Sequence, residues 1–380
     1  MKWEKVKLSD VTESCLGKML DQNKNIGTYK PYLANINVRW GEFDLENLPL
    51  MRFEDREEDR YGLKSGDIVL CEGGEPGRCA IWKDLIPNMK FQKALHRIRV
   101  NREMDCYYLY YWFLMAGRAK ILDQYFTGST IKHLPSIKLK EIVIDKPPLE
   151  IQKHIGSILS TYDDLIENNQ KQIKLLEEAA QRLYKEWFVD LRFPGHENVK
   201  IVDGVPEGWS KSKVGLLIGG IKRNRKVKTA EYCKEGIIPV IDQGENFIGG
   251  YIDDESALIK IKEPVIVFGD HTRRLKLVQF DFASGADGTQ LISALIPEMA
   301  FRLLYCSLQN IDLSNYSYAR HFKYLKEEII VVPSVKVASM FERISTDLFD
   351  KIQKSRDEIT VLQEARDRLL PKLMSGEIEV

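Results

Sequence analysis

The side chains that could do chemistry are scattered along the chain and do not stand at catalytic spacings. The six histidines (96, 133, 154, 196, 271 and 321) include no HExxH pair, and the six cysteines (15, 71, 79, 106, 233 and 306) include no CxxC pair. We therefore expect no metal site, no disulfide framework and reduced thiols. The sequence also lacks a GxxxxGK(S/T) phosphate loop, a GxGxxG turn after a strand, the (D/N)PP(Y/F/W) and FxGxG motifs, a (D/E)xK triplet and a GxSxG elbow. These absences disfavour nucleotide hydrolases, dinucleotide enzymes, adenine methyltransferases, nucleases and serine hydrolases.

Binding to phosphates and base edges is the chemistry that the sequence does offer. Residues 222–228 (KRNRKVK) hold five basic residues and no acidic one. Further basic clusters lie at 271–274 and 320–326. Arginine can hold guanine, and asparagine adenine, through two hydrogen bonds. Taken singly, each cluster is also what a solvated surface loop looks like.

The candidate DNA contacts are glycines or polar residues of such loops. In the first part of the chain they are Gly73, Gly74, Arg78, Ser129, Thr130, Lys132 and His133. In the second part they are Arg223, Asn224, Arg225, His271, Thr272, Arg273, Arg274, Tyr318, Arg320, His321 and Lys323. Many of them could contact phosphate instead of bases, since most hydrogen bonds to DNA do so. The chain has 56 Lys+Arg and 56 Asp+Glu, so any basic surface must be local.

Two long heptad patterns must position these loops. They run from about Leu149 to Trp187 and from about Ser334 to Met374, with Pro371 near the end of the second. Apolar residues recur at alternating spacings of four and three, which predicts two helices with a coiled-coil seam. The seam residues we assign to the spacer are Tyr162, Ile166, Ile173, Leu176, Leu183, Leu348, Ile352, Ile359, Leu362 and Leu369.

The two patterns share one register, 186 residues apart (352 − 166 = 186; 369 − 183 = 186). Pro147 and Pro333, which follow strand-like stretches, keep the same offset. Asn169 and Ser355 stand at equivalent seam positions, where a polar residue either fixes the register or is a tolerated polar residue in the core. The helices are alike and the segments before them are not, so we infer a duplicated frame with diverged heads.

The predicted fold class is α+β, with two globular α/β domains separated by two long antiparallel coiled-coil helices and a pseudo-twofold internal repeat. The predicted boundaries are 1–148 for the first domain, 149–190 for its helix, 191–208 for a linker, 209–333 for the second domain, and 334–380 for the second helix and tail. The charged start MKWEKVKLSD does not resemble a signal peptide, and no apolar run of about 18 residues occurs. We expect a cytoplasmic protein without a membrane association.

Several segments resemble the specificity subunits of Type I restriction–modification enzymes. Residues 149–197, beginning LEIQKHIGSILSTYDDLIENN, resemble the family's central conserved region. VPEGW (205–209) and VLQEARDRLLPKLMSGEIEV (361–380) are typical of the family, and VFGDHTR (267–273) and SGADGTQLI (284–292) look like recurring segments of its target-recognition domains. The likeness covers the whole chain, and the order of the segments makes it specific.

The resemblance implies a DNA-binding subunit without catalytic residues. Each target-recognition domain would read one half of a split site in double-stranded DNA, and the helices would act as the spacer. Modification (methyltransferase) subunits, two of them, would dock on this frame and carry S-adenosylmethionine, and restriction subunits would use ATP and Mg. A helix of about 39 residues is roughly 58 Å long, against the ~34–36 Å between half-sites one turn apart.

Two other functions remain open at this stage. A coiled-coil scaffold with two ligand-binding heads and no DNA role fits the helices and the neutral net charge, but leaves the basic loops unexplained. An enzyme of an unfamiliar class, such as a restriction–methyltransferase fusion fragment, would transfer methyl groups to DNA on its own.

Overall fold

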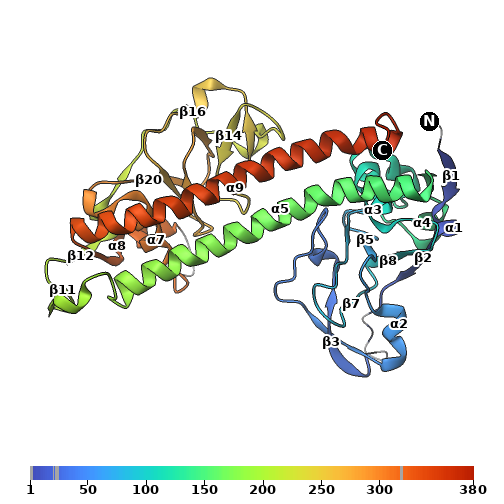
Figure 1. Cartoon of the computed structure of the whole chain (residues 1–380), viewed down its shortest axis with the longest axis horizontal. Coiled ribbons are helices and arrows are strands. Elements are labelled where there is room, and N and C mark those ends of the chain that lie inside the picture. The colour runs from blue at the N-terminus through green and yellow to red at the C-terminus, as the bar shows by residue number, and fades with distance from the viewer. Residues whose placement is uncertain (1–2, 20, 22–24, 317–319) are drawn as a thin grey trace. The chain divides into compact units, whose positions relative to one another are not determined.

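The structure is a computed structural model that describes residues 3–19, 21, 25–316 and 320–380. The chain divides into two compact units (Figure 1). Unit 1 comprises Met1–Glu167 and Ile359–Val380, and unit 2 comprises Asn168–Glu358. Below, head 1 means residues 3–148 and head 2 means residues 209–333, so that each unit consists of a head and parts of two long helices.

Head 1 is built on a four-stranded sheet and a three-stranded sheet, in the orders β2-β8-β5-β6 and β4-β3-β7. Its strands are β1 (Glu4–Lys7), β2 (Thr12–Leu16), β3 (Thr28–Leu33), β4 (Leu50–Phe53), β5 (Ile68–Cys71), β6 (Cys79–Ile81), β7 (Lys90–Phe91), β8 (Leu95–Val100) and β9 (Val143–Lys146). Its helices are α1 (Leu8–Val11), α2 (Glu58–Tyr61), α3 (Cys106–Arg118) and α4 (Ser136–Glu141).

Head 2 has two four-stranded sheets, β13-β20-β17-β18 and β15-β14-β19-β16. Its strands are β12 (Ser210–Lys213), β13 (Ile218–Gly220), β14 (Ile238–Ile241), β15 (Gly250–Ile252), β16 (Leu258–Ile259), β17 (Val265–Gly269), β18 (Leu275–Val278), β19 (Phe282–Ser284), β20 (Thr289–Ala294) and β21 (Ile329–Val332). Its helices are α6 (Val214–Leu217), α7 (Phe301–Gln309) and α8 (His321–Glu327). A hairpin of β10 (Ile201–Val202) and β11 (Val205–Pro206) precedes it.

The two heads repeat one topology, which confirms the predicted internal duplication. The larger sheets have matching strand orders, and each smaller sheet contains one parallel pair, β3–β7 or β14–β19. The short sheets that precede the long helices even share a register. Lys7 pairs with Val143 and Lys213 with Ile329, so the offset of 186 extends to the last strand of each head (329 − 143 = 186), whereas the first strands are 206 residues apart (213 − 7 = 206).

The long helices are α5 (Leu149–Tyr184), continued by a π-helical turn at Lys185–Val189, and α9 (Val335–Ser375). In unit 1 the first part of α5 packs against the last part of α9, where Leu159 and Leu370 share one core. In unit 2 the last part of α5 packs against the first part of α9, where the Tyr184 and Phe341 rings are 6.5 Å apart. The pairing is therefore antiparallel in each unit. Each residue assigned to the spacer seam is buried or half-buried.

Polar contacts tie each half of the helix pair together. In unit 1, Arg366 of α9 donates to Asp163 of α5, whose other carboxylate oxygen accepts from the Tyr111 hydroxyl of α3 at 2.6 Å. In unit 2, Arg356 donates to Glu177 at 2.9 Å. The predicted seam residues Asn169 and Ser355 are both buried.

Gly156 explains how head 1 approaches α5 so closely. A Cβ atom at this position would lie 2.7 Å from an Asp105 carboxylate oxygen and 3.0 Å from the Tyr107 Cβ. Both belong to the start of α3, where Asp105 caps the helix by accepting from the Tyr108 amide. Glycine inside a helix is unfavourable by about 1 kcal/mol relative to alanine, and here it permits the contact between head and helix.

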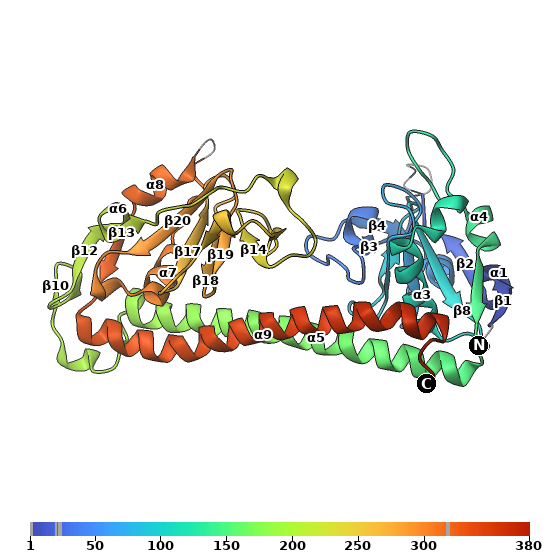
Figure 2. The same ribbon diagram turned by 90° about the horizontal axis from the view of Figure 1, so that it is seen from above.

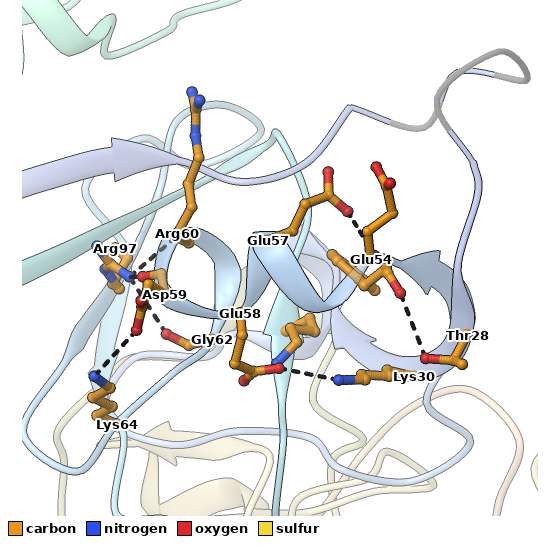
Figure 3. Close-up of polar contacts among 12 residues, drawn as sticks. Thr28, Lys30, Glu54, Glu57, Glu58, Asp59, Arg60, Gly62, Lys64 and Arg97 are labelled. Atoms are coloured by element: carbon orange, nitrogen blue, oxygen red, sulfur yellow. Dashed lines mark hydrogen bonds and ion pairs between the residues drawn. The ribbon is translucent and has the colours of Figure 1, made fainter.

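The smaller sheet of head 1 is fastened by the acidic segment around α2 (Figure 3). Glu58 accepts from Lys30 at 3.0 Å and from the fully buried Lys90. Burial raises the pKa of Glu58, but the hydrogen bonds from Lys90 and Lys30 outweigh burial and hold it below its ordinary value. Arg97 of β8 donates to three backbone carbonyls at the end of α2, those of Asp59, Arg60 and Gly62.

Candidate nucleic-acid interface

The predicted DNA-contacting loops of head 2 leave the same end of its larger sheet (Figure 2). Because β13, β20 and β17 are successively antiparallel, Gly220 lies near Ile292 and Gly269 pairs with Thr289. The segments 221–228, 285–288 and 270–274 therefore emerge side by side. In head 1, the pairs Leu16–His96 and Cys71–Leu95 gather segments 17–19, 92–94 and 72–78 in the same way. We call these two surfaces the sheet ends.

Two distant candidate segments of head 1 meet at its sheet end. Gly73 forms a β-bridge with His133, and the Leu134 amide donates to the Glu72 carbonyl at 2.7 Å. His96, buried beneath this loop, faces the Leu134 carbonyl at 2.8 Å, and burial lowers its pKa despite that contact. The loop that carries Ser129, Thr130, Lys132 and His133 is exposed.

A hollow of about 590 Å³ lies between these segments. The predicted residues Gly74, Ser129, Thr130 and Lys132 line it, together with Trp40, Lys120 and Phe126. The Trp40 indole donates to a Glu75 carboxylate oxygen at 2.6 Å. Gly117 of α3 makes room for that indole, because a Cβ atom there would lie 2.3 Å from the Trp40 Cη2. Hydroxyls and aromatic faces around this hollow suit the bases of a nucleic acid, whereas the carboxylates of Glu75 and Asp123, which also line it, partly offset its lysines.

Arg78 differs from its neighbours, because its side chain is turned inward. It is 15% exposed and forms an ion pair with Glu75 at 3.1 Å. Its guanidinium also donates to the carbonyl and the side-chain oxygen of Asn35, at 3.0 and 2.7 Å. Asn35 in turn donates to the Gly73 carbonyl at 2.5 Å. In this structure Arg78 shapes the glycine turn and has little surface left for DNA.

Gln243 organises the corresponding turn of head 2. Its side-chain oxygen accepts from the His271 amide at 3.1 Å, and its backbone carbonyl accepts from the Thr272 hydroxyl at 2.8 Å. A Cβ atom at Gly288 would meet the Gln243 amide group at 2.5 Å, so that glycine lets the 285–288 loop close over it. His271 and Thr272 themselves are exposed at the surface of the turn.

Asp270 joins the turn to α8. Its backbone carbonyl accepts from the amide and the Nδ1 of His321, at 2.9 and 2.8 Å, and its carboxylate accepts from the Phe322 amide at 2.8 Å. The other ring nitrogen of His321 faces the Tyr316 carbonyl at 3.1 Å. His321 is 8% exposed, so it holds the start of α8 in place and offers no free nitrogen to a base edge. Arg320 and Lys323, beside it, are exposed.

Arg273 and Arg274 are both exposed, and their guanidinium groups contact different parts of head 2. Arg273 has a left-handed backbone, with φ 61°, and its guanidinium donates to the Leu313 carbonyl at 3.1 Å. Arg274 forms a loose ion pair with Glu245 at 3.5 Å. Arg274 and His271 therefore remain the residues of this turn that could reach DNA by a side-chain rotation.

In segment 221–228, successive side chains alternate between the interior of head 2 and the solvent. Arg223 donates to Gln290 at 3.3 Å, and burial lowers its pKa. Arg225 forms ion pairs with Glu231 and with Asp254, the latter at 3.4 Å. The Asn224 side chain donates to the Leu258 carbonyl at 2.5 Å. These three predicted residues thus have partners inside head 2.

Sequence reasoning missed Asn35 and Gln243, although a signal exists. Each follows the last residue of its strand, Leu33 of β3 or Ile241 of β14, by two positions. Only the match between the two heads reveals this equivalence. Tyr318, also a candidate, lies outside the described residues. The DNA-binding role of the candidates stays a prediction.

The described residues contain neither a metal-binding cluster nor a membrane-spanning helix. In residues 3–19, 21, 25–316 and 320–380, no group of three or more His, Cys, Asp or Glu is placed to hold a metal ion. Within the same ranges, no helix combines the length and the apolar character needed to cross a membrane.

Comparison with known proteins shows what the chain is similar to. The model of the Type I restriction modification DNA specificity domain matches residues 1–178. The specificity subunit of the Type I restriction enzyme MjaIX from Methanocaldococcus jannaschii is 29% identical over 344 residues, covering 83% of this chain and 78% of that protein. The chain is thus similar to Type I restriction–modification specificity subunits over most of its length.

Two further proteins are similar to the chain. The MjaVIII specificity subunit of the same organism is 28% identical over 242 residues, 62% of this chain and 53% of that protein. The crystal structure of the S subunit of a Type I restriction-modification system from M. genitalium has a TM-score of 0.59 at 18% identity, covering 98% of this chain and 96% of that one. The predicted fold, with two sheet-rich domains and long helices between them, is thus that of a Type I specificity subunit.

Proposed function

We propose that this chain is a specificity subunit that binds a bipartite DNA site without catalysing a reaction, and that each head reads one half of it. The observation that carries the proposal is the repetition of one sheet end, with different loops, in two heads on a duplicated frame. Because the two heads share one arrangement of strands, we expect both to dock on DNA in the same orientation. Different loops, EGGEPGR at 72–78 and DHTRR at 270–274, support unlike half-sites.

We assign base reading to exposed residues of the loops at the sheet ends. In head 1 these are Ser129, Thr130 and Lys132 around the hollow, and in head 2 they are His271 and Arg274. Arg78, Arg225 and His321 are assigned to positioning, since their polar groups are used within the heads. Side chains that are held by the fold keep the reading loops in one conformation, which favours specific over non-specific contact.

The helices supply the spacer and a docking frame. A helix of 36 residues, such as α5, is about 54 Å long at 1.5 Å per residue. Modification subunits would dock on α5 and α9 and carry S-adenosylmethionine, while restriction subunits would supply the ATP-dependent activity. This assignment agrees with the names of the relatives, which are specificity subunits of Type I restriction enzymes.

The test exchanges the reading loops one head at a time. The full chain, assembled with its modification subunits, is used to select bound sites from a randomised duplex library. We expect the double variant His271→Ala/Arg274→Ala to relax one half of the selected site, and the matched variant Ser129→Ala/Thr130→Ala to relax the other half.

Two results would overturn the proposal. If either variant relaxed both halves together, the heads would not read separate half-sites. If the unmodified assembly selected no sequence at all, the scaffold alternative would be favoured.

A further inference from the structure

Charge is distributed unevenly between the two sheet ends. In head 2, segments 221–228, 270–274, 285–288 and 320–323 together contain nine Lys or Arg and two Asp. In head 1, the corresponding segments 17–19, 72–78, 92–94 and 127–133 contain four Lys or Arg and two Glu. The net charge of the whole chain, which is zero, conceals this difference.

The cations of the sheet end of head 1 are mostly neutralised within the fold. Lys18 is buried against Glu57, at 2.5 Å. Arg78 is paired with Glu75 at 3.1 Å, and Lys132 with Asp123 at 3.4 Å. A cation that already has a carboxylate partner must lose it before it can neutralise a phosphate, so these groups gain little from DNA.

Segment 221–228 presents its lysines on the opposite face from its arginines. Lys222, Lys226 and Lys228 are exposed, whereas Val227 is fully buried and bridges Gly285 in the floor of the sheet end. The neighbouring carboxylates, Glu231 and Asp254, are taken up by Arg225.

Within the described residues, none of the three lysine ammonium groups forms an ion pair with a carboxylate, although the charge of Lys228 helps to lower the pKa of Glu231. The arginines thus anchor the segment, and the lysines form a free cationic row.

We propose that head 2 supplies most of the electrostatic attraction for the DNA backbone, through the lysine row Lys222, Lys226 and Lys228. Head 1 contributes contacts that depend little on salt. This proposal rests on the proposed DNA-binding function and adds a division of labour to it. It concerns phosphates, not bases, so the row binds duplexes of any sequence and sets how strongly the subunit adheres to DNA before it finds its site.

The test is the salt dependence of binding to a random-sequence duplex, measured with the purified full chain between 50 and 200 mM salt, a range of about fourfold over which released counterions are easily counted. Each phosphate contact contributes about 0.9 to the slope of log K against log salt concentration. We expect Lys222→Gln/Lys226→Gln/Lys228→Gln to reduce the slope by about 2 to 3. The charge-retaining variant, with arginine at the same three positions, should keep it.

The matched control removes three lysines of head 1 that already have carboxylate partners. Lys5→Gln/Lys64→Gln/Lys138→Gln, whose ammonium groups pair with Asp145, Asp59 and Glu141, should lower the slope by less than about 1. An equal or larger loss in this control would overturn the division of labour, and so would an unchanged slope in the triple variant of the lysine row. If the unmodified chain bound the duplex without any salt dependence, the DNA-binding function itself would fail. Circular dichroism of each variant verifies that the fold is intact.

Discussion

The pair Asp163–Arg366 offers a prediction that is specific to unit 1. Its two side chains are 22% and 15% exposed and lie in the helix seam. Replacement of Asp163 by alanine would leave Arg366 with Asp367 alone and remove the acceptor of the Tyr111 hydroxyl. Breaking a buried ion pair from one side costs about 3–5 kcal/mol. Because the groups reach solvent and Asp367 remains, we expect about 2–3 kcal/mol here.

Two buried thiols allow this loss to be measured separately in each unit. Cys79 of head 1 and Cys306 of head 2 are both fully buried, so a thiol reagent modifies them only when the surrounding structure opens. A loss of 2–3 kcal/mol corresponds to a rise of about 30- to 150-fold in the open population. In Asp163→Ala, therefore, the labelling of Cys79 in native buffer should accelerate by this factor, while that of Cys306 should not change.

The matched control is the ion pair of unit 2. Glu177→Ala removes the partner of Arg356, at 2.9 Å, and should accelerate the labelling of Cys306 and not that of Cys79. If both thiols responded equally to either variant, the two units would open as one cooperative structure. If Cys79 did not respond to Asp163→Ala, the seam pair would have no stabilising role and the reasoning from its burial would be refuted.

Three further predictions concern the heads. Hydrogen bonds from lysines outweigh burial and lower the pKa of Glu57 and Glu58, so the stability they give is present above their unfolded value of about 4.3 and is lost as pH falls through the folded pKa. Near-UV circular dichroism should therefore show the smaller sheet of head 1 opening below about pH 4.3, and a Glu57→Gln/Glu58→Gln variant should lack this acid transition. Gly117→Ala should displace Trp40, shifting its fluorescence and weakening DNA binding by head 1, although alanine favours the helix by about 1 kcal/mol. Asp270→Ala should speed hydrogen exchange of the Phe322 amide, at a cost of about 1–2 kcal/mol; unchanged exchange would contradict the tie between turn and helix.

The pair of long helices is predictable from sequence because the heptad pattern depends on near neighbours and continues over many residues. Heptads repeat along both helices, and a slip by one residue would expose the whole apolar row. The offset of 186 between Ile166 and Ile352 recurs in the strand pairing of the heads, where Val143 and Ile329 hold equivalent places. The duplication therefore predicts the position of the last strand of each head, which the heptad pattern of the helices alone does not.

The reading surface is less predictable because residue type does not reveal a distant partner. Arg78 is an apt guanine ligand by type, but Asn35 lies 43 positions away and occupies it. His321 is likewise occupied by the carbonyl of Asp270, 51 positions away. The lysines of segment 221–228 are counted in a basic cluster but are not among the candidate contacts, for the opposite reason. In an extended segment alternate residues face opposite sides, and only the structure shows that Lys226 faces outward and Arg225 inward.

The most direct test of the central claim is a map of the methylated bases in genomic DNA treated with the full chain and its modification subunits. Two heads on one duplicated frame predict a single motif made of two unlike halves, separated by a gap of constant length and free composition. A contiguous motif, or two halves whose separation varied from site to site, would contradict it.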